Sequence, residues 1–317
     1  MSSKTELLTT AGSMEELVRL MDAGADAFVL GESRFGLRLA GEFDRRLMAE
    51  AVALAAPRGV RIYAAINNLM DNKIIAELPE YMASLAEAGV AALVFGDPAV
   101  LMAAKTALPA IGLHWNAEMT STNYATANFW GRRGASRVVL ARELNMEQVL
   151  EVKRNTALEV EVQVQGITNI YHSKRSLVNS YIEHHNGSGQ DGNRLPRKLD
   201  ADKAEGLYLI ETERQSERYP IYEDANGTHI MSSEDICMLE SLHELLEAGI
   251  DSLKVDGFMK SIAYNEATVR AYRKVIDTYN ADPDGYVFNE QWLDEIRALQ
   301  DPNRELSFGF FYKEQVY

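Results

Sequence analysis

The stretch Gly-Ala-Asp-Ala-Phe-Val-Leu-Gly at residues 24–31 decides the fold, because its pattern returns along the chain. A glycine ends an amphipathic stretch, and a short apolar run begins one to three residues later, as again in segments 59–67, 89–96, 134–141 and 249–257. Helices often end on a glycine in the left-handed conformation. An uninterrupted short apolar run suits a parallel strand buried on both faces. The chain is therefore expected to repeat a helix–glycine–strand unit.

Eight strands are expected, at residues 7–10, 27–30, 61–66, 92–96, 111–115, 137–141, 159–165 and 252–256, with amphipathic helix patterns between them. Strands that alternate with helices form a parallel sheet, and eight right-handed crossovers close it into a barrel. We therefore predict an α/β protein with a TIM-like (β/α)8 barrel. An open, doubly wound sheet is the alternative fold.

The predicted barrel domain covers residues 1–280 and includes a polar insertion at 166–230 after strand seven. Within the insertion we expect a hairpin of segments 206–212 and 219–224, and after it a helix from 232 that carries Cys237 in an apolar setting. An insertion there lies among the loops that follow the strands, where barrels carry their sites. It is either a surface excursion or an arm that covers the site or docks a partner. Residues 281–317 are expected as a tail whose aromatic end packs on the barrel or on a partner.

Charge and cysteine content exclude several classes of protein. The chain has 317 residues, 32 Lys and Arg against 47 Asp and Glu, and a net charge of −15. Nucleic-acid binding relies on concentrated positive charge, so the chain is expected to bind nucleic acid poorly by itself. No apolar run reaches the roughly 18 residues of a membrane span. The single cysteine rules out an intrachain disulfide and an all-cysteine metal or iron–sulfur site. We predict a cytoplasmic protein without a membrane segment.

Candidate site residues follow the strands, because barrel chemistry takes place at the carboxyl ends of the strands. The catalytic candidates are His114, Arg142, Glu143, Lys254 and Asp256. The substrate-binding candidates are Glu32, Arg34, Arg38, Asn67, Asn116, Glu118, Gln165 and Lys260. A set rich in Arg, Lys and Asn suits an anionic small molecule or a phosphate. No metal site is predicted, since no His-x-x-x-His pair occurs, and the Gly-x-Ser-x-Gly and phosphate-loop motifs are also absent.

Several of these segments together resemble one known family. They are Ala11–Ser13, Phe35–Arg38, Arg142–Leu144, and Lys-Val-Asp-Gly-Phe-Met-Lys-Ser at 254–261 with Tyr264. They resemble the collagenase-like peptidases of unknown catalytic type (peptidase class U), over about residues 6–279. Asn169 and Ser176 stand where that family usually has two cysteines of an iron–sulfur cluster. The resemblance therefore implies that this chain holds no such cluster.

In its short length and its missing cysteines, the chain resembles one branch of the family, which comprises the small partner proteins of transfer-RNA uridine hydroxylation. This resemblance implies a subunit of a prephenate-dependent system that hydroxylates wobble uridine at carbon 5. It implies a cysteine-bearing paralogue as partner, contact with transfer RNA through the complex, no cofactor bound by this chain alone, and a prephenate-like small molecule as ligand. Two alternatives remain open: a peptidase, as the family name suggests, and a non-catalytic scaffold for the paralogue.

Overall fold

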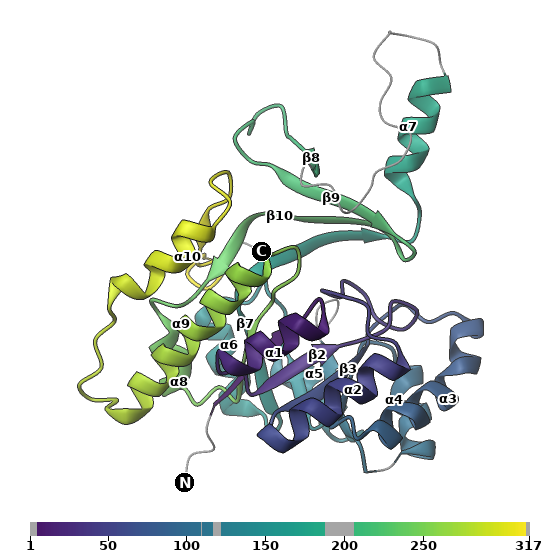
Figure 1. Ribbon diagram of the computed structural model, residues 1–317, viewed down its shortest axis with the longest axis horizontal. Helices are drawn as coiled ribbons and strands as arrows, with labels where there is room; N and C mark the ends of the chain where they lie inside the picture. Colours follow the sequence, from purple (N-terminus) through teal and green to yellow (C-terminus); the bar gives the residue numbers. More distant parts are fainter. Residues whose placement is uncertain (1–4, 109, 117–121, 188–205, 315–317) are drawn as a thin grey trace. The chain divides into compact units, whose positions relative to one another are not determined.

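A computed structural model describes residues 5–108, 110–116, 122–187 and 206–314. The larger of two compact units holds a closed barrel of eight parallel strands, some of which are labelled in Figure 1. They are β1 (Glu6–Thr10), β2 (Ala27–Leu30), β3 (Arg61–Ile66), β4 (Ala92–Phe95), β5 (Gly112–Asn116), β6 (Arg137–Val139), the first part of β7 (Glu159–Ser173) and β11 (Ser252–Val255). Each strand pairs in parallel with the next, and β11 closes the circle by pairing with both β7 and β1. The barrel prediction is confirmed, and the open sheet is excluded.

Helices fill the connections between the barrel strands. They are α1 (Met14–Asp22), α2 (Arg45–Ala55) with the 3-10 turn η1 (Ala56–Arg58), α3 (Asn72–Ala88), α4 (Pro98–Ala107), α5 (Tyr124–Gly131), α6 (Met146–Asn155), α8 (Leu242–Glu247) and α9 (Ile262–Ala281). After α9 come η2 (Glu290–Leu293), α10 (Asp294–Leu299) and β12 (Leu306–Ser307). In the predicted aromatic tail, Phe311 is buried and its carbonyl accepts a hydrogen bond from the Met146 amide at 2.9 Å. No helix among the described residues is long and apolar enough to cross a bilayer.

Strand alternation decides which side chains enter the barrel. On β5, Trp115 points outward and stacks on Trp130 of α5, with ring centroids 4.0 Å apart. Successive strand residues point to opposite faces. The neighbours of Trp115, His114 and Asn116, therefore face the barrel interior.

A second compact unit consists of residues 167–235 and 301–306. It contains the later part of β7, the helix α7 (Leu177–Gly187), and the strands β8 (Leu207–Leu209), β9 (Tyr219–Asp224) and most of β10 (Gly227–Cys237). The sheet order is β7-β10-β9-β8, and β8 and β10 both run antiparallel to β9. The predicted hairpin of segments 206–212 and 219–224 is confirmed.

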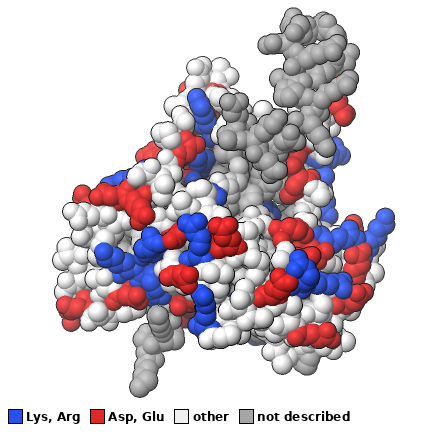
Figure 2. Space-filling view, viewed as in Figure 1, with Lys and Arg blue, Asp and Glu red and all other residues white. Residues whose placement is uncertain are grey.

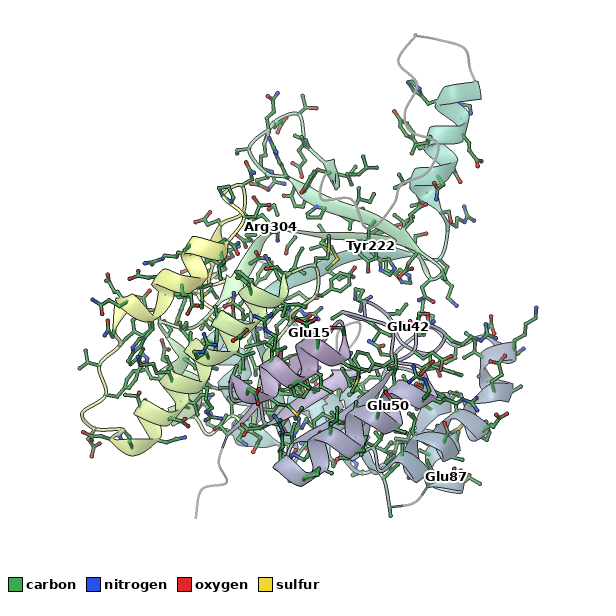
Figure 3. The ribbon with its side chains drawn as sticks, in the orientation of Figure 1. Glu15, Glu42, Glu50, Glu87, Tyr222 and Arg304 are labelled. Atoms are coloured by element: carbon green, nitrogen blue, oxygen red, sulfur yellow. The ribbon has the colours of Figure 1, made fainter. Side chains whose placement is uncertain are left out.

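The predicted helix from residue 232 is wrong over its first part. Strand β10 continues to Cys237, which lies at its buried end, and α8 begins only at Leu242. A distant segment explains the difference. Arg304, which is labelled in Figure 3, forms an ion pair with the fully buried Asp235 at 2.8 Å and donates to the carbonyl oxygens of Ser232 and Glu234, each at 3.0 Å. These tertiary contacts fix the extended conformation despite a locally helical pattern.

One glycine in β7 sets how closely the barrel strands approach near their carboxyl ends. Gly166 has a φ of 107°, and a Cβ there would lie 2.3 Å from the carbonyl oxygen of Asp256. A side chain is therefore excluded both by the conformation and by the neighbouring backbone. Gly59 has a φ of 71°, but a Cβ at that position would meet nothing within 4 Å.

We expect Gly166→Ala to lower the free energy of unfolding by about 2 kcal/mol or more, since strain and a backbone clash add together. Gly59→Ala should cost only about 1 kcal/mol, from conformation alone. Urea denaturation of the two variants tests the comparison. Equal losses would show that the backbones of β7 and β11 can move apart at no cost.

Candidate functional site

The barrel interior has an apolar half and a polar half. Small and aliphatic side chains from neighbouring strands form the apolar half, which consists of Leu8, Ala27, Val29, Ala92 and Val94. Alternation on β5, β6, β7 and β11 brings polar side chains to the opposite half: His114, Asn116, Arg137, Glu161, Gln163 and Lys254. Since buried polar groups are costly unless they are partnered, the candidate site belongs to this half.

The polar half begins with an ionic cluster at the amino ends of the strands. Arg137 is fully buried and lies 2.6 Å from Glu6, 2.7 Å from Glu159 and 3.3 Å from Glu161. Tyr63 and Ser252 donate hydrogen bonds to Glu6 at 2.6 and 2.8 Å, and Arg61 forms an ion pair with it. One buried guanidinium thus holds carboxylates from β1 and β7 together.

The pKa values of the two buried carboxyl groups of this cluster, Glu6 and Glu161, are shifted in opposite directions. Burial alone would raise the pKa of Glu6, but the charge and hydrogen bonds of Arg137, with the Tyr63 hydroxyl, hold it below its ordinary value. Burial raises the pKa of Glu161, and attraction to Arg137 only partly opposes this. Glu6 therefore serves as the main counter-ion of Arg137, and Glu161 more readily keeps a proton.

A second polar group lies at the carboxyl ends of the strands. Arg142 follows β6, and its Nε donates to Oε1 of Gln163 at 2.5 Å. Gln163 is the cross-strand neighbour of Lys254, whose Nζ lies 3.0 Å from the carboxylate of Asp256. We call Arg142, Gln163, Lys254 and Asp256 the mouth cluster. Two cations held by an amide and a carboxylate form a site suited to an anion.

His114 lies inside the barrel, below the mouth cluster. Its ring packs edge-on against Tyr63 with centroids 4.6 Å apart, and its Nδ1 is buried without a hydrogen-bond partner. Burial, with repulsion from Arg137 and Arg61, lowers the pKa of His114 well below its ordinary value. The imidazole is therefore neutral at physiological pH and does not act as a cation.

The loop between β2 and α2 holds the candidates Glu32, Arg34 and Arg38. Arg34 forms an exposed two-point ion pair with Glu77 of α3, at 2.5 and 2.9 Å, so its guanidinium is directed to that helix. Burial and the nearby Glu42 raise the pKa of Glu32. Arg38 adopts a φ of 52°, and Asn67 accepts a hydrogen bond from the Leu37 amide at 2.9 Å. Asn67 thus supports the loop on β3.

The remaining candidates are scattered. Gln165 is fully buried and bonds Tyr264 and Tyr272 of α9 at 2.8 and 3.0 Å, which places it against the outer helices. Lys260 lies over the Tyr264 ring at 4.9 Å. Glu143 is exposed beside Arg142, and Asn116 faces the interior at the end of β5. Glu118 lies outside the described residues.

Sequence reasoning missed Gln163, Glu161 and Arg137. The useful signal was the alternation Glu159-Val-Glu161-Val-Gln163 in β7, where apolar residues point outward and polar residues point inward. A bulge beside Val255 then shifts the register, so that Gln165 pairs with Val255. The sequence predicted Gln165 as the site residue at the end of this strand, but the bulge leaves Gln163 as the residue beside Lys254.

The residues present do not fit the iron–sulfur cluster that the family resemblance suggests. Cys237 is the only thiol and is buried. Asn169 carries an amide, and Ser176 a hydroxyl, where thiolates would be needed. Within the described part of the chain, no group of three or more His, Cys, Asp or Glu residues is arranged to hold a metal ion.

The visible surface carries both signs of charge. Figure 2 shows acidic and basic side chains interspersed over the viewed face. Many are paired between neighbouring helical segments, as in Arg45 with Glu80 and Arg58 with Asp22, each at 2.6 Å. The viewed face therefore has no continuous basic field of the kind that attracts a nucleic-acid backbone.

The fold defines a (β/α)8-barrel protein with two cationic side chains, Arg142 and Lys254, at the carboxyl ends of its strands. The model of peptidase family U32 matches residues 12–316, and the chain belongs to that family. A solved structure of the U32 peptidase Mk0906 has the same fold, with a TM-score of 0.50 and 17% identity over 81% of this chain and 94% of that one.

Two relatives come from Bacillus subtilis (strain 168). The chain is 48% identical to tRNA hydroxylation protein P2 over 99% of both chains. It is 32% identical to tRNA hydroxylation protein P1 over 100% of this chain and 74% of that protein. A short and a longer member of the family therefore occur in one organism.

We expect Arg137→Met to lower the free energy of unfolding by about 3–5 kcal/mol, because it leaves buried carboxylates without their counter-ion. Arg61→Met is the matched control, since Arg61 is half exposed and Glu6 would keep Arg137; its cost should be about 1 kcal/mol or less. Chemical denaturation at neutral pH measures both. Similar losses in the two variants would contradict the central role of Arg137.

Proposed function

We propose that this chain is the cluster-free subunit of a system that hydroxylates the wobble uridine of transfer RNA at carbon 5. The observation that carries the proposal is full-length similarity, at 48% identity, to a protein named for tRNA hydroxylation. The net charge of −15 supports a division of labour in which a partner provides most of the RNA contact. Such a subunit works in the cytoplasm, with transfer RNA.

The partner we propose is a longer, cysteine-bearing paralogue that holds the iron–sulfur cluster. Support comes from the relatives: a P2-like and a P1-like protein occur together in one organism, and the P1-like protein has additional chain beyond the matched region. This chain has the barrel and the mouth cluster but lacks the thiolates. A heteromer would supply both parts.

The ligand we propose for the mouth cluster is a small, prephenate-like carboxylate. Lys254 and Arg142 provide two cationic donors, and their partners Asp256 and Gln163 hold them in place. Each donor suits a carboxylate group. No residue of this chain is assigned a step of the oxidation itself.

A peptidase is less well supported, because the mouth cluster offers no activated nucleophile. The Thr10 hydroxyl, at the end of β1, accepts a hydrogen bond from the Gly257 amide at 3.0 Å. His114 lies deeper in the barrel and is neutral. Hydrolysis of a peptide needs a nucleophile next to a base, and this arrangement does not provide that pair.

We expect deletion of the gene to remove the nucleosides derived from 5-hydroxyuridine from transfer RNA. The intact gene should restore them, whereas Lys254→Met and Arg142→Met should restore at least about tenfold less, since a charged hydrogen bond contributes about 1.5–3 kcal/mol. Arg58→Met is the control, because Arg58 pairs with Asp22 at the opposite end of the barrel. Nucleoside mass spectrometry measures the result. Unchanged modification in the deletion strain would refute the proposed function.

The tagged chain, purified from its own cells, should carry the longer paralogue with it at a fixed ratio. Mass photometry of the purified material gives the stoichiometry, and iron analysis shows whether the partner brings a cluster. A chain that purifies alone, from cells in which both proteins are present, would contradict the heteromer.

A further inference from the structure

Glu161 is a buried acid that links the two polar groups of the barrel. It lies on the interior face of β7, two residues before Gln163 and opposite Ser252 of β11. Its side chain is almost fully buried, and Arg137 contacts it at 3.3 Å, the longest of the Arg137 ion pairs. Lys254 lies on the paired strand β11, two residues beyond Ser252, and its charge also acts on Glu161. Glu161 therefore contacts the cation of the ionic cluster and lies two residues along the strands from the level of the lysine of the mouth.

Charged and titratable groups face this part of the interior from most of the barrel strands. They are Glu6 on β1, Arg61 and Tyr63 on β3, His114 on β5, Arg137 on β6 and Arg142 after it, Glu159 on β7, and Lys254 with Asp256 on and after β11. The interior residues of β2 and β4 are apolar. Glu159 and Arg61 are half exposed, so water screens them.

The three buried carboxyl groups, Glu6, Glu161 and Asp256, are not equally well paired with the cations around them. Glu6 has the short contact to Arg137, and Asp256 has the contact to Lys254. Glu161 is left with the weakest pairing of the three. A weakly paired ionised carboxylate in such a place is costly, and protonation removes that cost.

We propose that Glu161 is the positioning residue of the anion site, and that its protonated form leaves Lys254 able to bind the anionic ligand. When Glu161 loses its proton, its carboxylate competes with the ligand for Lys254 and adds a negative charge beneath the site. Ligand binding and protonation of Glu161 therefore favour each other. This inference rests on the proposed ligand of the mouth cluster.

The direction of the pH effect follows from this linkage. Below the pKa of Glu161 in the free protein the acid already carries its proton, and affinity for the anion is constant. Above that pKa each binding event takes up a proton, so the dissociation constant rises by up to about tenfold per pH unit. His114 does not contribute, since it stays neutral over this range.

Isothermal titration of the full-length chain with prephenate, and separately with sulfate, tests the inference from about pH 5.5 to about pH 8.5. Both anions keep their charge over that range, so any change in affinity belongs to the protein. Measurement in two buffers with different ionisation enthalpies gives the number of protons taken up. Glu161→Gln mimics the protonated acid, and we expect it to bind at high pH as tightly as the unmodified chain does at low pH, with no proton uptake.

Glu159→Gln is the matched control, because it lies on the same strand, faces the same way and also pairs with Arg137, but is half exposed. It should keep the pH dependence of the unmodified chain. Proton uptake by the unmodified chain tests the linkage between ligand binding and protonation even where Glu161→Gln fails to fold. Tight binding without pH dependence or proton uptake overturns the role of Glu161 alone. Failure of both anions to bind at any pH overturns the proposed ligand, and with it this inference.

Discussion

The rest of the structure depends on the buried guanidinium of Arg137. A charge removed from water must find compensating charges and hydrogen bonds, and Arg137 finds them in Glu6, Glu159 and Glu161. These residues belong to β1 and β7, while Tyr63 and Ser252, which bond Glu6, belong to β3 and β11. Because one-residue slips turn interior side chains outward, the cluster fixes the register of several strands at once.

The same strand register fixes the positions of the mouth-cluster residues Gln163 and Lys254. Two residues beyond Glu161 and its strand partner Ser252, the interior face of β7 and β11 carries Gln163 and Lys254, so polar side chains continue on these two strands toward the carboxyl end of the barrel. Gly166 then lets β7 pass close to the backbone of Asp256. The cations at the mouth are held by barrel strands and the turns directly after them, which suits a site that must keep two donors at a set separation.

The fold was accessible from sequence because each barrel strand carries its own signal: a glycine at the end of a helix, then a short apolar run. Arg142, Lys254 and Asp256 were found because they directly follow or end such runs. Gln163 was missed for Gln165 because a bulge changes the parity of β7, which no local pattern reveals. Strand β10 was missed because its extended form depends on Arg304, which lies almost 70 residues away in the chain and pairs with Asp235 at 2.8 Å.

An energetic argument distinguishes a binding barrel from a bare scaffold. Replacing a buried ion network with apolar residues of similar volume is often neutral or stabilising, so a barrel that only supports a partner has no need of a charged interior. Here Lys254 and Asp256 remain mostly buried at the mouth, beside Arg142 and above a neutral His114. The strand register accounts for Arg137, whose ion pairs join β1 and β7, whereas the ion pair of Lys254 with Asp256 joins two residues of one segment. This buried lysine is the reason to favour the proposed anion-binding role over a passive support.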